Sequence, residues 1–121
     1  MDVEAARYLG AGLASIALIG AGSIGTALGN IMAETGKDAI LLHSIEAQIV
    51  ENINQTHINS KYFPTLHLHP GLHATTDDRL LEHCKIIFLA IPSVIMIDYL
   101  KKIHRHIAPD TLFVNIAKGF G

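Results

Sequence analysis

The chain has 121 residues, of which 50% are hydrophobic and 17% are charged, and its formal net charge is −2. So large an apolar fraction excludes an intrinsically disordered chain, and the length predicts a single folded domain. The nearly balanced charge excludes the basic surface typical of nucleic-acid-binding domains. One cysteine, Cys84, excludes a disulfide-stapled fold and favours a reducing compartment, so we expect a cytoplasmic protein.

The N-terminal part could be mistaken for a membrane segment, because no charged residue lies between Arg7 and Glu34. The stretch is crowded with glycine and interrupted by serine, threonine and asparagine. It also lacks the basic start of a signal peptide, since Asp2 and Glu4 precede Arg7. We therefore expect no membrane insertion, and we interpret residues 1–14 as an extension before the repeating pattern.

The first predicted unit is a strand at 15–19 followed by a helix at 23–35. The strand is a short apolar run that ends at Gly20, which is typical of a strand buried on both faces. The helix carries apolar residues at helical spacing, and Gly36 provides a natural stop.

A second buried strand is predicted at 38–43 and a second helix at 45–55, because isoleucine and valine recur there at helical spacing. Residues 56–71 contain two prolines, several polar residues and a glycine, and we expect mostly loop. A short strand is predicted at 72–75.

The C-terminal part begins with a short helix predicted at 76–84, capped by Thr76 or Asp77. A strand follows at 85–90, then a helix that starts at Pro92 and runs to about Ile107. The residues expected to face inward from that helix are Met96, Leu100, Ile103 and Ile107. The last predicted strand covers 111–116.

Strands that alternate with helices and are apolar throughout indicate a parallel sheet covered on both faces. The predicted fold is therefore α/β, a Rossmann-type doubly wound sheet in a single domain.

The turn between the first strand and helix reads Gly20-Ala21-Gly22-Ser23-Ile24-Gly25, a Gly-x-Gly-x-x-Gly pattern in the strand–turn–helix context of dinucleotide-binding proteins. Gly20 allows the tight turn, Gly22 lets a pyrophosphate approach the backbone, and Gly25 lets the helix pack closely on the strand. The helix N-terminus offers free N–H groups to the phosphates. These residues form the predicted cofactor-binding turn.

The end of the second strand bears on the choice between NAD and NADP. An acid about 20 residues after the turn would bind the adenine ribose, whereas a basic residue would favour a 2′-phosphate. Glu46 is the only acid near this position, although it stands about one turn late, and no Arg or Lys lies between Lys37 and Lys61. This pattern favours NAD.

Four segments together resemble one family. They are the turn at 20–29, the string Ile53-Asn54-x-Thr56-His57-x-Asn59-x-Lys61-Tyr62-Phe63-Pro64, the motif Ala90-Ile91-Pro92-Ser93, and Ala117-Lys118-Gly119. The chain resembles the N-terminal cofactor domain of the NAD(P)-dependent glycerol-3-phosphate dehydrogenases over residues 15–121. The 53–64 string is the most specific segment, because other dinucleotide dehydrogenases share only the turn.

The resemblance implies an oxidoreductase that transfers hydride between NAD(P)H and dihydroxyacetone phosphate or sn-glycerol 3-phosphate, in glycerophospholipid synthesis. It implies cofactor contacts at Ser23 and Ile24, although the family usually has an aromatic residue where Ile24 stands. A basic or imidazole side chain near the cofactor ribose falls on Ser44 or Ile45 here, which puts NADP preference in doubt.

At the other end of the cofactor, the resemblance implies that Ile91, Pro92 and Ser93 lie beside the nicotinamide ribose. It implies that Lys118 contacts both cofactor and substrate. Lys118 also follows the carboxyl end of a predicted strand, where open parallel sheets bind ligands. An ammonium group there can stabilise charge on a substrate oxygen.

The family's helical second domain, which supplies the general-base lysine, has no counterpart in this sequence. We therefore expect a chain that is C-terminally truncated relative to the family, and that binds a dinucleotide without turning over substrate. The apolar surface around the last strand should be partly uncovered, so we expect self-association or a homodimer.

Two alternatives stay open. One is another small-substrate dehydrogenase, similar to ketopantoate reductase or 6-phosphogluconate dehydrogenase, against which the 53–64 string argues. The other is a non-catalytic nucleotide-binding sensor, which has no need of Lys118.

Other chemical groups are given structural interpretations. His67, His69 and His73 are expected to be solvated loop residues and not zinc ligands, because no cysteine accompanies them. Cys84 is expected to be a buried, unreactive thiol, although Lys85 beside it could lower its pKa. Asp77 and Asp78 are expected to complement a helix dipole without catalytic pairing.

Overall fold

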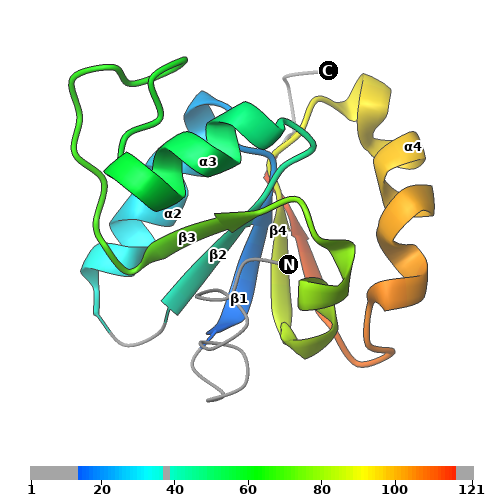
Figure 1. Ribbon diagram of the computed structural model, residues 1–121. Helices are drawn as coiled ribbons and strands as arrows, with labels where there is room; N and C mark the ends of the chain where they lie inside the picture. Colours follow the sequence, from blue (N-terminus) through cyan, green and yellow to red (C-terminus); the bar gives the residue numbers. More distant parts are fainter. Residues whose placement is uncertain (1–13, 37–38, 117–121) are drawn as a thin grey trace.

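The computed structural model describes residues 14–36 and 39–116, with the side chains of 14 and 15 left aside. Five strands form one parallel sheet in the order β3-β2-β1-β4-β5 (Figure 1). The strands are β1 (Ala14–Ile19), β2 (Ala39–His43), β3 (Leu72–Thr75), β4 (Ile86–Leu89) and β5 (Leu112–Asn115). The doubly wound parallel sheet predicted from the sequence is confirmed.

Helices cover both faces of the sheet, as Figure 1 shows. The α-helices are α2 (Ser23–Glu34), α3 (Ala47–Thr56) and α4 (Ser93–Ile103), and two 3₁₀ helices are η1 (Asp78–His83) and η2 (His104–His106). Neighbouring residues of β1 divide between two apolar cores, because side chains alternate across a strand. Leu18 packs in the core beneath α2 and α3, whereas Ala17 and Ile19 pack in the core beneath α4 and η1.

Most predicted elements agree with the structure within two residues, while one differs in kind and one in length. The segment predicted as a helix over 76–84 is the 3₁₀ helix η1, and of its two candidate caps Asp77 is the one used, accepting from the Arg79 N–H at 2.9 Å. The last helix ends at Ile103 instead of about Ile107, and the chain tightens into η2.

Side-chain burial corrects two further expectations. Tyr99, which the apolar pattern of α4 did not single out, is buried with Ile103, while Met96, Leu100 and Ile107 are half-buried around them. His73, expected in a solvated loop, lies buried in β3 with only 5% of its surface exposed.

The exposed side chains of β5 agree with the expectation of an uncovered apolar surface near the last strand. Leu112 is 59% exposed and Phe113 is 38% exposed, whereas every residue of β2 is buried. Within residues 14–36 and 39–116, no helix has the length and apolar character needed to cross a bilayer.

Strand order reverses at β1, which pairs with β2 on one side and β4 on the other. In open α/β sheets such a reversal leaves a crevice at the carboxyl ends of the strands, where ligands bind.

Candidate functional site

The glycine turn between β1 and α2 is closed by contacts that leave no room for larger side chains. Gly20 has φ +109°, a conformation that favours glycine. A Cβ added at Gly25 would lie 1.9 Å from the Gly20 carbonyl oxygen, so the helix can approach the turn only with glycine there. The structural reasons predicted for these two glycines are therefore confirmed.

Gly22 differs because it faces open space. A Cβ added there would meet nothing closer than Tyr62 Cζ at 4.0 Å, so protein packing does not require a glycine. Gly22 is also the N-cap of α2, whose first turn has no acidic residue and no side-chain cap. The free N–H groups and the dipole of this helix end suit a phosphate, and the missing side chain lets one approach.

A buried asparagine anchors the 57–71 loop to this turn. Asn59 is fully buried, and its Nδ2 donates to the Ala21 carbonyl oxygen at 3.0 Å and to Thr26 Oγ1 at 2.9 Å. The loop thereby places Tyr62 in front of Gly22. In the sequence, Asn59 and Tyr62 stood out only as parts of the 53–64 string. The structure shows that Asn59 anchors the loop and that Tyr62 faces Gly22.

Two adjoining cavities of about 220 and 170 Å³ open at the carboxyl ends of the strands. They share Gly22, Tyr62, Ala90, Ile91 and Pro92, so they form one continuous crevice. The half beside β4 and β5 adds Ser23, Ile24 and Ile116, and none of its described lining residues is charged. The half beside β2 adds Gly20, Ala21, Ser44, Ile45, Glu46, Ile95 and Tyr99.

The two halves correspond in position to the places where dinucleotide-binding proteins of this fold hold the two ends of the cofactor. In this fold the adenosine lies toward the end of the second strand, and the pyrophosphate lies at the glycine turn. We call the half beside β2 the adenosine half and the half beside β4 and β5 the nicotinamide half.

Polar groups at the end of β2 border the adenosine half. Ser44 is buried, and its Oγ accepts a hydrogen bond from the Glu46 N–H at 3.0 Å, while the Ile45 side chain is 61% exposed. The Glu46 carboxylate meets Lys61 Nζ at 3.1 Å, and the Lys61 ammonium lies 5.5 Å from the centre of the Tyr62 ring. The hydrogen bond and charge of Glu46 raise the pKa of Lys61.

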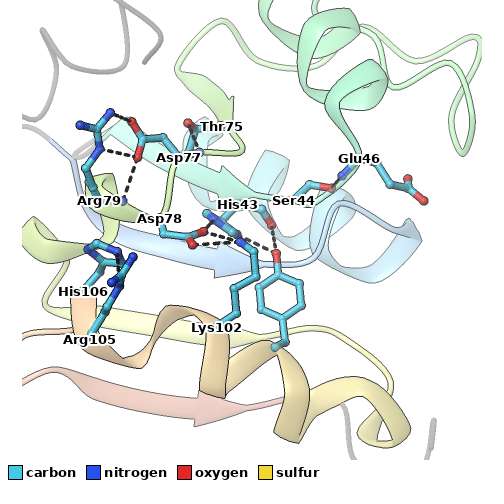
Figure 2. Close-up of polar contacts among 11 residues, drawn as sticks. His43, Ser44, Glu46, Thr75, Asp77, Asp78, Arg79, Lys102, Arg105 and His106 are labelled. Atoms are coloured by element: carbon cyan, nitrogen blue, oxygen red, sulfur yellow. Dashed lines mark hydrogen bonds and ion pairs between the residues drawn. The ribbon is translucent and has the colours of Figure 1, made fainter.

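Behind the adenosine half, four polar side chains join β2, η1 and α4 (Figure 2). His43 is buried, and its Nε2 lies 2.8 Å from Asp78 Oδ1 while its Nδ1 lies 2.6 Å from the Tyr99 hydroxyl. Lys102 Nζ binds both oxygens of Asp78 at 2.8 and 2.9 Å. Asp78 stands in the first turn of η1, as expected, and its pairing with His43 and Lys102 is a contact that the sequence did not predict.

The hydrogen-bond partners and the burial of His43 indicate its charge and its tautomer. Burial lowers the pKa of His43 despite the opposing effect of Asp78, and burial raises the pKa of Tyr99. A neutral imidazole with its proton on Nε2 donates to Asp78 and accepts from the Tyr99 hydroxyl, which satisfies every group. For Asp78, burial opposes ionisation, but hydrogen bonds from Lys102 and His43 outweigh it and lower the pKa.

The crevice brings together most of the residues proposed from sequence. Its lining includes Gly20, Ala21, Gly22, Ser23, Ile24, Ser44, Ile45 and Pro92. Gly25 lies behind the lining, in contact with Gly20. Lys118 lies outside the described residues. In the sequence it follows by two positions Ile116, which lines the nicotinamide half.

Metal-ligating residues and the single cysteine are the other groups with potential chemistry. Among the described His, Cys, Asp and Glu residues, no group of three lies close enough together to hold a metal ion. Cys84 is buried, and burial raises the pKa of its thiol to about 12, so the expectation of a buried, unreactive thiol is confirmed.

Known proteins resemble both this sequence and this fold. The family described as NAD-dependent glycerol-3-phosphate dehydrogenase N-terminus matches residues 15–121. A glycerol-3-phosphate dehydrogenase [NAD(P)+] from Leptospira biflexa is 42% identical over 105 residues, which are 86% of this chain and 31% of that protein. The chain thus spans about a third of that relative's length.

Solved structures agree with the family match. Glycerol-3-phosphate dehydrogenase from Coxiella burnetii is 29% identical with a TM-score of 0.76, over 86% of this chain and 33% of that one. The enzyme from Saccharomyces cerevisiae, at 24% identity and a TM-score of 0.79 over 87% of this chain and 33% of that one, shares the fold. On its sequence and its fold, the chain belongs to the family of NAD-dependent glycerol-3-phosphate dehydrogenase N-terminal domains.

Proposed function

We propose that residues 15–121 are the dinucleotide-binding part of an oxidoreductase that interconverts dihydroxyacetone phosphate and sn-glycerol 3-phosphate in the cytoplasm. The observation that carries this proposal is the crevice at the reversal of strand order, with Gly22 and the N-terminus of α2 open to it. The family membership supplies the reaction class.

In this proposal the glycine turn holds the pyrophosphate of NAD or NADP. Gly22, Ser23 and Ile24 contact it from the N-terminus of α2, while Gly20, Ala21 and Gly25 keep the turn in shape. Ser44 and Ile45 face the adenosine ribose. Pro92 faces the nicotinamide ribose at the start of α4.

The bound nicotinamide would supply the hydride that reaches C2 of the substrate. The apolar nicotinamide half, formed in part by Ile24, Ile91 and Ile116, would keep water from the reacting carbon. Lys118 would bind a substrate oxygen and stabilise the negative charge that develops there before a proton arrives. The resemblance assigns that proton transfer to a lysine of the helical domain.

Calorimetric titration with NADH and with NADPH tests the cofactor step. We expect saturable binding of at least one of them, and Gly22→Ala should weaken it while the protein stays folded. A folded chain that binds neither dinucleotide would contradict the proposal.

A second titration tests the substrate. Dihydroxyacetone phosphate added to the chain saturated with reduced cofactor should bind, and Lys118→Met should weaken that binding, whereas Lys101→Met on the exposed side of α4 should not. If the cofactor binds and the substrate does not, Lys118 does not hold the substrate without the family's helical domain.

A further inference from the structure

The ion pair between Glu46 and Lys61 bears on which cofactor the crevice selects, and this inference rests on the proposed function. Glu46 follows β2 and caps α3, and Lys61 comes from the 57–71 loop, 15 residues later in the chain. Nζ and Oε1 lie 3.1 Å apart, with the two side chains 56% and 45% exposed. An ion pair so exposed adds little to stability, so both groups are available to a ligand.

The place of the pair in the fold identifies the ligand atoms that it would meet. Glu46 lines the adenosine half together with Ser44 and Ile45, just after β2 ends. Residues at this point of a dinucleotide-binding sheet face the 2′-position of the adenosine ribose. That position carries a hydroxyl group in NAD and a phosphate in NADP.

The two side chains would act on this position in opposite directions. A carboxylate accepts a hydrogen bond from a ribose hydroxyl and repels a phosphate, whereas an ammonium attracts the phosphate. None of the described lining residues of the adenosine half is basic. Glu46 also lines a neighbouring cavity whose lining includes Lys61, so the ion pair puts the Lys61 ammonium next to the adenosine half, within reach of a phosphate there. No basic residue lies between Lys37 and Lys61, but the loop brings Lys61 itself into contact with Glu46 at the border of the adenosine half.

The loop that carries Lys61 is held in place. Asn59, two residues earlier, is fully buried and bonded to the glycine turn, and Tyr62, one residue later, lines both halves of the crevice. Lys61 therefore stands on a fixed backbone, while its flexible side chain can leave Glu46 and reach an incoming phosphate.

We propose that Lys61 binds the 2′-phosphate of NADP, that Glu46 binds the 2′-hydroxyl of NAD, and that the ion pair between them lets the crevice accept both cofactors. When NADP binds, the Lys61 side chain leaves Glu46 and its ammonium group pairs with the 2′-phosphate instead. NAD binding leaves the ion pair intact.

The test compares the affinities of NADH and NADPH in single variants. Lys61→Met removes the charge and keeps most of the stem, and it should weaken NADPH binding roughly tenfold, as loss of a charged hydrogen bond does, with NADH changed by less than about twofold. Glu46→Gln should act in the opposite sense, tightening NADPH binding and weakening NADH binding. Lys101→Met is the charge-matched control and should leave the ratio of the two affinities unchanged.

Salt gives an independent readout. The affinity of the wild-type chain for NADPH relative to NADH should fall as ionic strength rises, and the same ratio in Lys61→Met should change less. If Lys61→Met weakens the binding of both cofactors equally, or of neither, the inference is overturned while the proposed function stays intact. A wild-type chain that binds neither cofactor contradicts the proposed function itself, so the two failures are distinguishable.

Discussion

The glycine turn and the α4–β5 side of the molecule are built in different ways. Around the turn, Gly20, Gly25, Thr26 and Asn59 meet through close or buried contacts. On the other side, hydrophobic residues face solvent, with Val94 81%, Ile97 67% and Leu112 59% exposed. The region that would hold phosphates is thus fixed by its own packing, whereas the outer face of α4 and β5 has few contacts within the described part of the chain.

The largest effect is expected where packing is tightest. Gly25→Ala places a methyl group 1.9 Å from the Gly20 carbonyl oxygen, which is backbone and cannot move aside. We expect the free energy of unfolding in urea to fall by about 3 kcal/mol or more. A variant as stable as the wild type would show that the turn is not close-packed.

Asn59→Ala should have the next largest effect on stability. It leaves the buried Ala21 carbonyl oxygen and Thr26 hydroxyl without the donor, at a cost of about 2 kcal/mol. NADH affinity should fall as well, because Tyr62 is on the same loop. Gln55→Ala, on the exposed side of α3, is the matched control and should change neither quantity.

Gly22→Ala separates binding from folding within the same turn. The added methyl group meets only open space and Tyr62 at 4.0 Å, so stability should stay within about 0.5 kcal/mol of wild type. Cofactor affinity should fall roughly tenfold or more, because the methyl group occupies the space of the pyrophosphate. Equal losses of stability for Gly22→Ala and Gly25→Ala would contradict the distinction drawn between the two glycines.

The structural roles of these glycines could be predicted from the sequence because the whole turn is formed by six consecutive residues, 20–25. The strands could also be predicted, since apolar runs between glycine and polar segments are local signals. The contacts of His43 with Asp78 and of Glu46 with Lys61 could not, because they join residues 35 and 15 positions apart. Only the path of the chain brings them together, and a lone histidine at a strand end gives no signal of its partners.

His73 illustrates the same limit on a single strand. The strand at 72–75 was predicted correctly, but His73 was grouped with His67 and His69 as a solvated residue because its side chain is polar, and the structure buries it in β3. Tyr99 was missed for a related reason, because a hydroxyl group lowers its weight in an apolar pattern. Its role depends on His43, which lies on another element.

The pH dependence of stability tests the polar link between the two regions. Burial lowers the pKa of His43 below its usual 6.5, so the unfolded chain takes up this proton at a higher pH than the folded chain. The contribution of His43 is therefore fully present above pH 6.5 and is lost as pH falls from there toward the folded pKa. His43→Gln should reduce the slope of unfolding free energy against pH in this window, whereas the exposed His67→Gln should not. An unchanged slope in His43→Gln would assign the dependence to other groups.

The smallest effect on the fold is expected on the outer side of α4, where the effect should appear in association instead. Exposed apolar residues lie both on α4, at Val94 and Ile97, and on the edge strand β5, at Leu112 and Phe113, and exposed apolar residues of this kind favour self-association. Val94→Lys should change the unfolding free energy by less than about 0.5 kcal/mol, because that side chain is 81% exposed. It should nevertheless lower the apparent mass in concentration-dependent light scattering, because it puts a charge among the exposed apolar residues of α4. A wild-type chain that stays monomeric at high concentration would contradict the expected self-association, and would show that exposed apolar residues on this side do not by themselves bring two copies together.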